Sequence, residues 1–170
     1  LKSLGYRVLE VGNPSSMEEL FESIRQLSRP LHKEREAEQV IASMKGRLAT
    51  VQSRARALPH RLKTYIEIDT PFWTIGGHDF LTEALTYAGV DNLFADLTRP
   101  SAQVSPEVIV ERNPELILSF DLKKHEISRR AGWSAIQAVQ RGWVLDDVNR
   151  DALSRPSPAL VDGIEALERQ

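Results

Sequence analysis

The residues best suited to chemistry gather in one stretch of the sequence, between positions 69 and 79. Asp69, His78 and Asp79 could act as acid and base toward a bound substrate. Phe72 and Trp73 lie between them, and apolar rings in a loop are costly to leave in water unless they pack or meet a ligand. The stretch therefore predicts either an acid–base site in an α/β enzyme or an aromatic surface that binds a small molecule. A hydrophobic lid over a sheet is the purely structural alternative for the two rings.

A glycine pair and two further loops extend this candidate site. Gly76 and Gly77 would let the backbone approach a ligand, or turn sharply into a helix whose N-terminal amides could receive an anionic group. A plain turn explains the pair nearly as well. Segments 97–104 and 146–156 are loops that follow predicted strands or lie on the same edge of the sheet. Three loops on one edge predict the wall of a pocket.

Composition and motifs exclude several classes of function. The chain has 170 residues, no cysteine and a formal charge of −2, which excludes thiolate chemistry and the broad positive charge of a nucleic-acid binder. The four histidines are far apart in the sequence, and none has the helical spacing of a metal-binding pair, so no protein-held metal is expected. Walker, Gly-x-Gly-x-x-Gly and Gly-x-Ser-x-Gly motifs are also missing from the sequence.

Strands and helices alternate in the second half of the chain and must position these residues. Ser105, Pro106 and Glu107 provide an N-cap, a proline at the first helical position and a first-turn carboxylate. Trp133 and Trp143 are expected to pack in the core. The predicted elements are strands at 64–68, 116–120 and 143–145 and helices at 80–88, 105–112, 133–140 and 157–167. This alternation predicts an α/β fold with a parallel sheet.

The first 63 residues predict two helices and the end of an earlier αβ unit. Gly5 resembles a helix C-cap before a strand that ends at Val11, and the chain opens with Leu rather than Met, which favours a fragment or a processed form. Ser15 and Glu18 have the spacing of a capping box for a helix at 17–27. Between Pro30 and Pro59 one long helix is expected, with an apolar stripe of Leu31, Val40, Ile41, Met44, Leu48, Val51, Ala55 and Leu58.

The long helical segment is strongly basic. Residues 29–63 hold nine Lys or Arg and three Glu, a net charge of +6, whereas the remainder of the chain carries −8. A solvated helix face is the ordinary explanation of such a run, and a surface that binds an acidic partner is the alternative.

Several motifs occur together in the order of a known family. Thr64–Ile68, Pro71–Gly77, Gly89–Phe94, Gln103–Glu107, Asn113–Leu118, Trp133–Ile136 and Arg155–Pro158 cover most of residues 64–168. The set resembles the C-terminal lobe of the substrate-binding proteins of ABC importers for cobalamin, haem and ferric siderophores, with the cobalamin binders most similar. The resemblance implies a parallel-sheet C-terminal lobe with helices on both faces at 64–170. It also implies a long connecting helix at 29–63 and, at 1–28, a remnant of an N-terminal lobe that is otherwise missing.

The resemblance implies capture of a metal chelate in a cleft and its delivery to a membrane permease with its ATPase, at the periplasmic or extracellular face of the membrane. It implies no catalysis, no cofactor of the protein's own and no nucleic-acid partner. Contact with the membrane would come only through the permease or through a lipid anchor that this chain does not contain. Glu107 corresponds to a glutamate that docks on permease arginines. The implied ligand-binding residues are Phe72, Trp73, Gly76, Gly77, Ser101, Asn149, Arg150 and Arg155.

Overall fold

A four-stranded parallel sheet forms the centre of the computed structural model, which describes residues 2–5 and 8–170. The strands are β1 (Leu62–Glu67), β3 (Val90–Asn92), β5 (Leu116–Ser119) and β6 (Val144–Leu145), in the spatial order β3-β1-β5-β6. Every pairing within this sheet is parallel. The predicted α/β class is therefore confirmed, and the three predicted strands are present within a few residues of their expected ends.

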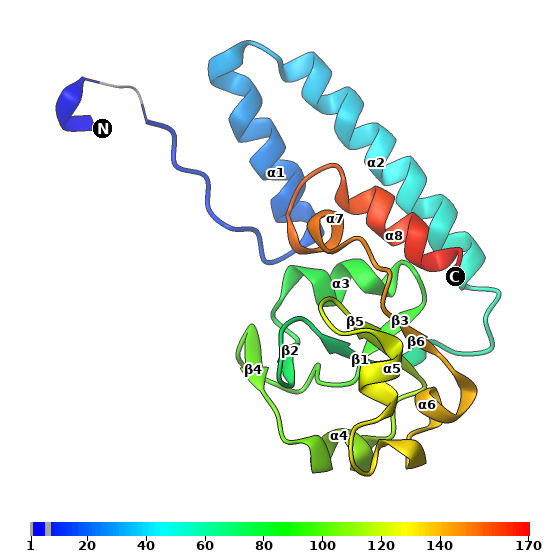
Figure 1. Ribbon diagram of the computed structural model, residues 1–170. Helices are drawn as coiled ribbons and strands as arrows, with labels where there is room; N and C mark the ends of the chain where they lie inside the picture. The colour runs from blue at the N-terminus through cyan, green and yellow to red at the C-terminus, as the bar shows by residue number, and fades with distance from the viewer. Residues whose placement is uncertain (1, 6–7) are drawn as a thin grey trace.

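Side chains alternate across the sheet and divide the interior into two apolar layers. Ile66 and Leu118 face one layer, whereas Tyr65 and Ile117 face the other, as the period of two along a strand requires. In Figure 1, α1, α2 and α8 lie above the sheet, and α4, α5 and α6 lie below it. The first layer is covered by α1 (Met17–Ser28), α2 (Glu34–Ala55), α3 (Phe80–Thr86), α7 (Arg150–Ser154) and α8 (Leu160–Glu168). The second layer is covered by α4 (Pro106–Arg112), α5 (Lys124–Ser128), the 3₁₀ turn η3 (Trp133–Ala135) and α6 (Gln137–Arg141).

Helix α1 begins at Met17, as predicted, but its N-cap is Ser16 rather than Ser15. The Ser16 hydroxyl accepts a hydrogen bond from the Glu19 amide at 3.2 Å. The Glu19 carboxylate accepts from the backbone amide and hydroxyl of Ser15, at 2.7 and 2.9 Å. The predicted capping box of Ser15 and Glu18 is therefore replaced by contacts of both serines with Glu19.

The predicted helix between Pro30 and Pro59 is shorter than expected. Pro30 lies in a 3₁₀ turn, η2 (Arg29–Leu31), and His32 has a left-handed backbone (φ 52°), so α2 begins only at Glu34. This turn folds α1 back along α2 (Figure 1). Leu31, Val40 and Leu58 are exposed, contrary to the predicted stripe. The buried members of α2 are Ala37, Ile41, Met44, Leu48 and Val51.

Three further expectations are corrected. Residues 8–11 form no strand, because no neighbouring strand in the described structure pairs with their backbone; Tyr6 and Arg7 lie outside the described residues. Ile136 has an extended backbone (ψ 132°) and splits the predicted helix 133–140. Trp133 is fully buried as expected, but Trp143 is 43% exposed because it lies just before the edge strand β6. No helix in the described part of the chain is long and apolar enough to cross a membrane.

Candidate functional site

A separate two-stranded antiparallel sheet lies beyond the carboxyl end of β1 and begins with Trp73. Strand β2 (Trp73–Ile75) pairs with β4 (Ser101–Gln103), and Trp73 lies opposite Gln103. The chain reaches β2 through a tight turn in which the Trp73 amide donates to the Asp69 carbonyl at 3.1 Å. Trp73 is 39% exposed. Ser101, expected in a loop, is instead in β4 opposite Ile75, which is two residues along β2 from Trp73.

The loops that follow β5 and β6 lie beside this turn, because β1, β5 and β6 are neighbours and parallel strands end at the same edge. The Arg150 guanidinium pairs with Asp121, which links the β6 loop to the β5 loop. Asn149 caps α7 by accepting from the Ala152 amide at 3.0 Å. Arg155 forms an exposed ion pair with Asp151 at 3.1 Å. The topology thus gathers Trp73 and these two loops along one edge; segment 146–156 is one of the predicted loops, whereas the predicted segment 97–104 reaches Trp73 through the pairing of β4 with β2.

Gly76 and Gly77 are places of close backbone approach. A Cβ atom at Gly76 would lie 2.0 Å from the Arg99 carbonyl oxygen, and one at Gly77 would lie 2.2 Å from the Ala95 carbonyl oxygen. The two amides donate within the chain, to Pro100 at 2.8 Å and to Leu97 at 3.2 Å. The pair therefore allows the end of β2 to pack closely on segment 95–100, which leads into β4.

Phe72 is held by two residues that the sequence analysis did not select. Its amide donates to the carboxylate of Glu67, which is buried at the end of β1, at 3.2 Å. Arg130 donates to both carboxylate oxygens of Glu67, at 2.6 and 2.7 Å, and its guanidinium lies 4.6 Å from the centre of the Phe72 ring. The available signal was a glutamate between two isoleucines, Ile66 and Ile68, since a charge at a buried position needs a partner.

The three residues of the predicted acid–base site are not bonded to one another in the described structure. Asp69 forms a β-bridge with Trp73, the first residue of β2. His78 follows the other end of that strand. Asp79 is the N-cap of α3 and accepts from the Leu81 amide at 2.8 Å, and burial raises the pKa of its carboxyl. No hydrogen bond or ion pair joins any two of these three described residues. Asp79 thus has a capping role.

Glu107 lies on an exposed part of α4, where Ser105 accepts from the Val108 amide and Pro106 occupies the first helical position. The cap and first turn match the sequence prediction. A hollow of about 690 Å³ lies elsewhere, beside the edge strand β3, and Lys63, Asp91 and Arg112 are among its lining residues. Among the described residues, no group of three His, Asp or Glu side chains could hold a metal ion.

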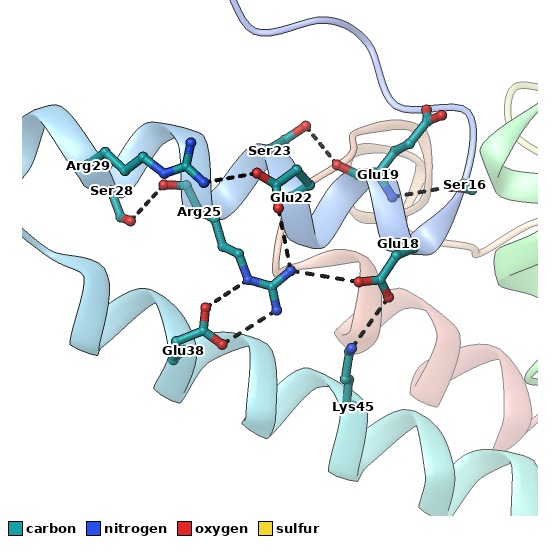
Figure 2. Close-up of polar contacts among 10 residues, drawn as sticks. All are labelled: Ser16, Glu18, Glu19, Glu22, Ser23, Arg25, Ser28, Arg29, Glu38 and Lys45. Carbon is teal, nitrogen blue, oxygen red and sulfur yellow. Dashed lines mark hydrogen bonds and ion pairs between the residues drawn. The ribbon is translucent and has the colours of Figure 1, made fainter.

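The basic segment 29–63 is largely neutralised by acidic residues of its neighbours. Arg47 donates to Glu165 of α8 at 2.8 and 2.9 Å and to Asp162 at 2.5 Å. Figure 2 shows Lys45 of α2 paired with Glu18 of α1, and Arg25 of α1 between several glutamates that include Glu38 of α2. Arg54 of α2 also pairs with Glu168 of α8, so Lys45, Arg47 and Arg54 each meet a carboxylate of a neighbouring helix. The structure therefore favours packing between helices over an electrostatic partner surface.

An α/β lobe whose loops gather at the carboxyl edge of a parallel sheet belongs to the class of folds that bind small molecules at that edge. Comparison with known proteins specifies the family. Residues 1–149 match the family described as "Periplasmic binding protein", and the chain belongs to that family.

Individual relatives agree with this assignment. An uncharacterized ABC transporter substrate-binding lipoprotein of Bacillus subtilis is 33% identical over 98% of the chain and 54% of its own length. A vitamin B12-binding protein of Vibrio vulnificus is 25% identical over 98% of the chain and 61% of its own length. A possible iron-binding, periplasmic solute-binding protein of Staphylococcus epidermidis superimposes with a TM-score of 0.88 at 23% identity, over 99% of the chain and 67% of that structure. The chain therefore spans only part of the proteins that it matches.

Proposed function

We propose that this chain is part of a solute-binding protein that captures a metal chelate and delivers it to the permease and ATPase of an ABC importer. In that two-lobed protein, residues 64–170 form the C-terminal lobe, 29–63 the connecting helix and 1–28 the last part of the N-terminal lobe, with α1 packed on α2. Its place is the periplasmic or extracellular face of the membrane. Family membership and the substrate-binding descriptions of the relatives support this proposal.

The observation that carries the proposal is the exposed ring of Trp73 at the carboxyl edge of the sheet. An indole that leaves 39% of the residue exposed offers a flat apolar surface for the face of a macrocycle or chelate. Phe72 directly precedes this residue in the turn that leads into β2, and it belongs to the same proposed surface. The polar groups of the ligand surface come from Ser101, Asn149, Arg150 and Arg155, while Gly76 and Gly77 allow close packing on segment 95–100.

The charges along this edge favour a chelate with neutral polar groups at its rim, such as cobalamin with its amides, over a polyanionic one. The three edge loops, 68–72, 120–123 and 146–156, contain five aspartates and three basic residues. Both arginines of the proposed surface are already paired, Arg150 with Asp121 and Arg155 with Asp151. A haem or a siderophore that presents several carboxylates or catecholates would have to displace these partners.

Glu107 is the proposed contact with the permease. It is exposed, and it lies in the first turn of α4. An exposed glutamate side chain can pair with arginines of a partner protein.

Ligand titration tests the proposal directly. The complete protein that contains this chain is titrated with cyanocobalamin, haemin and a ferric hydroxamate by isothermal calorimetry. A saturable, stoichiometric heat is expected for one of them, cyanocobalamin first. Trp73→Ala is expected to weaken that affinity by about tenfold or more, since a stacked aromatic contact is lost.

The matched control is Trp143→Phe. Trp143 is similarly exposed, at 43%, but it precedes β6 and therefore lies at the amino edge of the sheet. Its replacement is expected to leave the affinity unchanged. Failure of all three compounds to bind, or an equal loss in both variants, would refute the proposed site.

A further inference from the structure

A buried ion pair contacts the turn that precedes β2. Glu67 is 1% exposed, and the side chain of Arg130 is 15% exposed. The two groups meet in a bidentate arrangement with N–O distances of 2.6 and 2.7 Å, although 63 residues separate them in the sequence. Glu67 shares a face of β1 with Tyr65, and burial together with the nearby Glu67 charge raises the pKa of the Tyr65 hydroxyl.

This pair contacts the turn before Trp73 in two ways. The Glu67 carboxylate also accepts a hydrogen bond from the Phe72 amide at 3.2 Å. The Arg130 guanidinium lies 4.6 Å from the centre of the Phe72 ring and 4.6 Å from the Trp133 ring, so it rests over both. Phe72 has φ 62°, a left-handed conformation that L-residues other than glycine rarely adopt, and the surrounding contacts must therefore hold it.

Net stability is a poor explanation of such a pair. Removing two charges from water costs about as much as their attraction returns, and well-packed apolar side chains of similar volume often stabilise a fold as well. What a bidentate pair adds is a defined orientation, because both guanidinium nitrogens must face both carboxylate oxygens. Here the oriented carboxylate also fixes the direction of one loop amide.

We propose that Glu67 and Arg130 are positioning residues that hold Phe72 in its left-handed conformation and thereby present Trp73 at the edge of the sheet. Phe72 directly precedes Trp73, whose amide and carbonyl close the turn by hydrogen bonds to Asp69 and Ile68. The backbone of this turn therefore connects a change at Phe72 to Trp73. Only the last step, the effect on ligand affinity, rests on the proposed function.

Hydrogen–deuterium exchange in the ligand-free complete protein tests the positioning step. Glu67→Gln keeps the shape of the side chain but removes its charge. Exchange in segment 68–75 is expected to accelerate about tenfold or more, because a hydrogen bond to a charged group is weakened. Strand β5 should keep its exchange rate. Arg130→Lys keeps the charge but loses the bidentate fork, so it should accelerate the same segment and serves in place of Glu67→Gln if that variant fails to fold.

The matched control is Glu165→Gln, which breaks another bidentate pair, with Arg47, between α2 and α8. It should leave segment 68–75 unchanged. Equal acceleration of 68–75 and β5 in the Glu67 variant would assign the pair to general stability and overturn the proposal, as would no acceleration at all.

Ligand affinity separates this inference from the proposed function. With cyanocobalamin as the probe, Glu67→Gln is expected to weaken binding by about tenfold, in parallel with Trp73→Ala. Local acceleration of exchange without any loss of affinity in either variant would support the positioning role and refute the ligand-binding role of Trp73.

Discussion

Replacing Gly76 with alanine should destabilise the lobe far more than a single added methyl group ordinarily does. The new Cβ would lie 2.0 Å from the Arg99 carbonyl oxygen and 2.8 Å from that of Leu97, and both atoms belong to the backbone. An ordinary carbon–oxygen contact is about 3.3 Å, so the Arg99 carbonyl must move by about 1.3 Å. Side-chain rearrangement cannot relieve such a clash.

The movement would disrupt two hydrogen bonds at the same place. The Gly76 amide donates to Pro100 at 2.8 Å, and the Gly77 amide donates to Leu97 at 3.2 Å. Each such bond contributes about 1 kcal/mol, and overpacking adds about 1–3 kcal/mol. The free energy of unfolding should therefore fall by about 3 kcal/mol or more. Urea unfolding followed by far-ultraviolet circular dichroism should show a midpoint lowered by about 1 M or more.

Gly46→Ala is the internal comparison. Gly46 lies in the exposed middle of α2, and no atom approaches within 4 Å of the position of its added Cβ. Because alanine favours the helix, this variant should be more stable by about 0.5–1 kcal/mol. The two substitutions are chemically identical and should act in opposite directions. A Gly76→Ala protein that unfolds within about 0.5 kcal/mol of the parent would refute the close approach of segment 95–100.

Two further predictions concern the connecting helix and the surface of α4. The Arg47 guanidinium holds the pKa of the Glu165 carboxyl below its ordinary value, so this contribution to stability is present above pH 4.5 and lost as the pH falls. Arg47→Met should therefore reduce the free energy of unfolding by up to about 1 kcal/mol at pH 7 and by less at pH 3 in urea titrations; an equal loss at both would contradict the linkage. Glu107→Gln should leave cyanocobalamin affinity unchanged but weaken binding to the permease–ATPase complex of a cobalamin importer in liposomes by about tenfold. Glu34→Gln, which changes another exposed first-turn glutamate, should affect neither, and an equal loss there would argue against a specific contact.

Signals that act over a few residues were sufficient to predict much of the fold. The β-branched run at 64–68 lies mostly in β1, and Ser105 with Pro106 begins α4 where expected. Capping, helical period and strand composition depend on neighbours in the chain, so they survive in the folded protein. The Ser15 prediction was wrong by only one residue for the same reason, since both serines contact Glu19.

Predictions failed where a structure depends on distant partners. The apolar run that ends at Val11 has strand composition, but no strand lies beside it in the described structure. Strand β4 was missed because its residues become a strand only by pairing with β2. That segments 69–77 and 146–156 lie at one edge could be predicted, since parallel topology places strand ends together. The Arg150–Asp121 ion pair could not, because it joins side chains from different loops.

The three tryptophans separate what the sequence determined from what depended on the tertiary structure. The sequence by itself determined the alternating elements, the order of the family's motifs and the position of an aromatic turn after β1. Only the tertiary structure decided that Trp133 is fully buried, against Tyr65 and beneath Arg130, while Trp73 and Trp143 are exposed at opposite edges of the sheet. Burial depends on which distant segments cover a residue, and residues of the same type with similar local sequence therefore reach different environments.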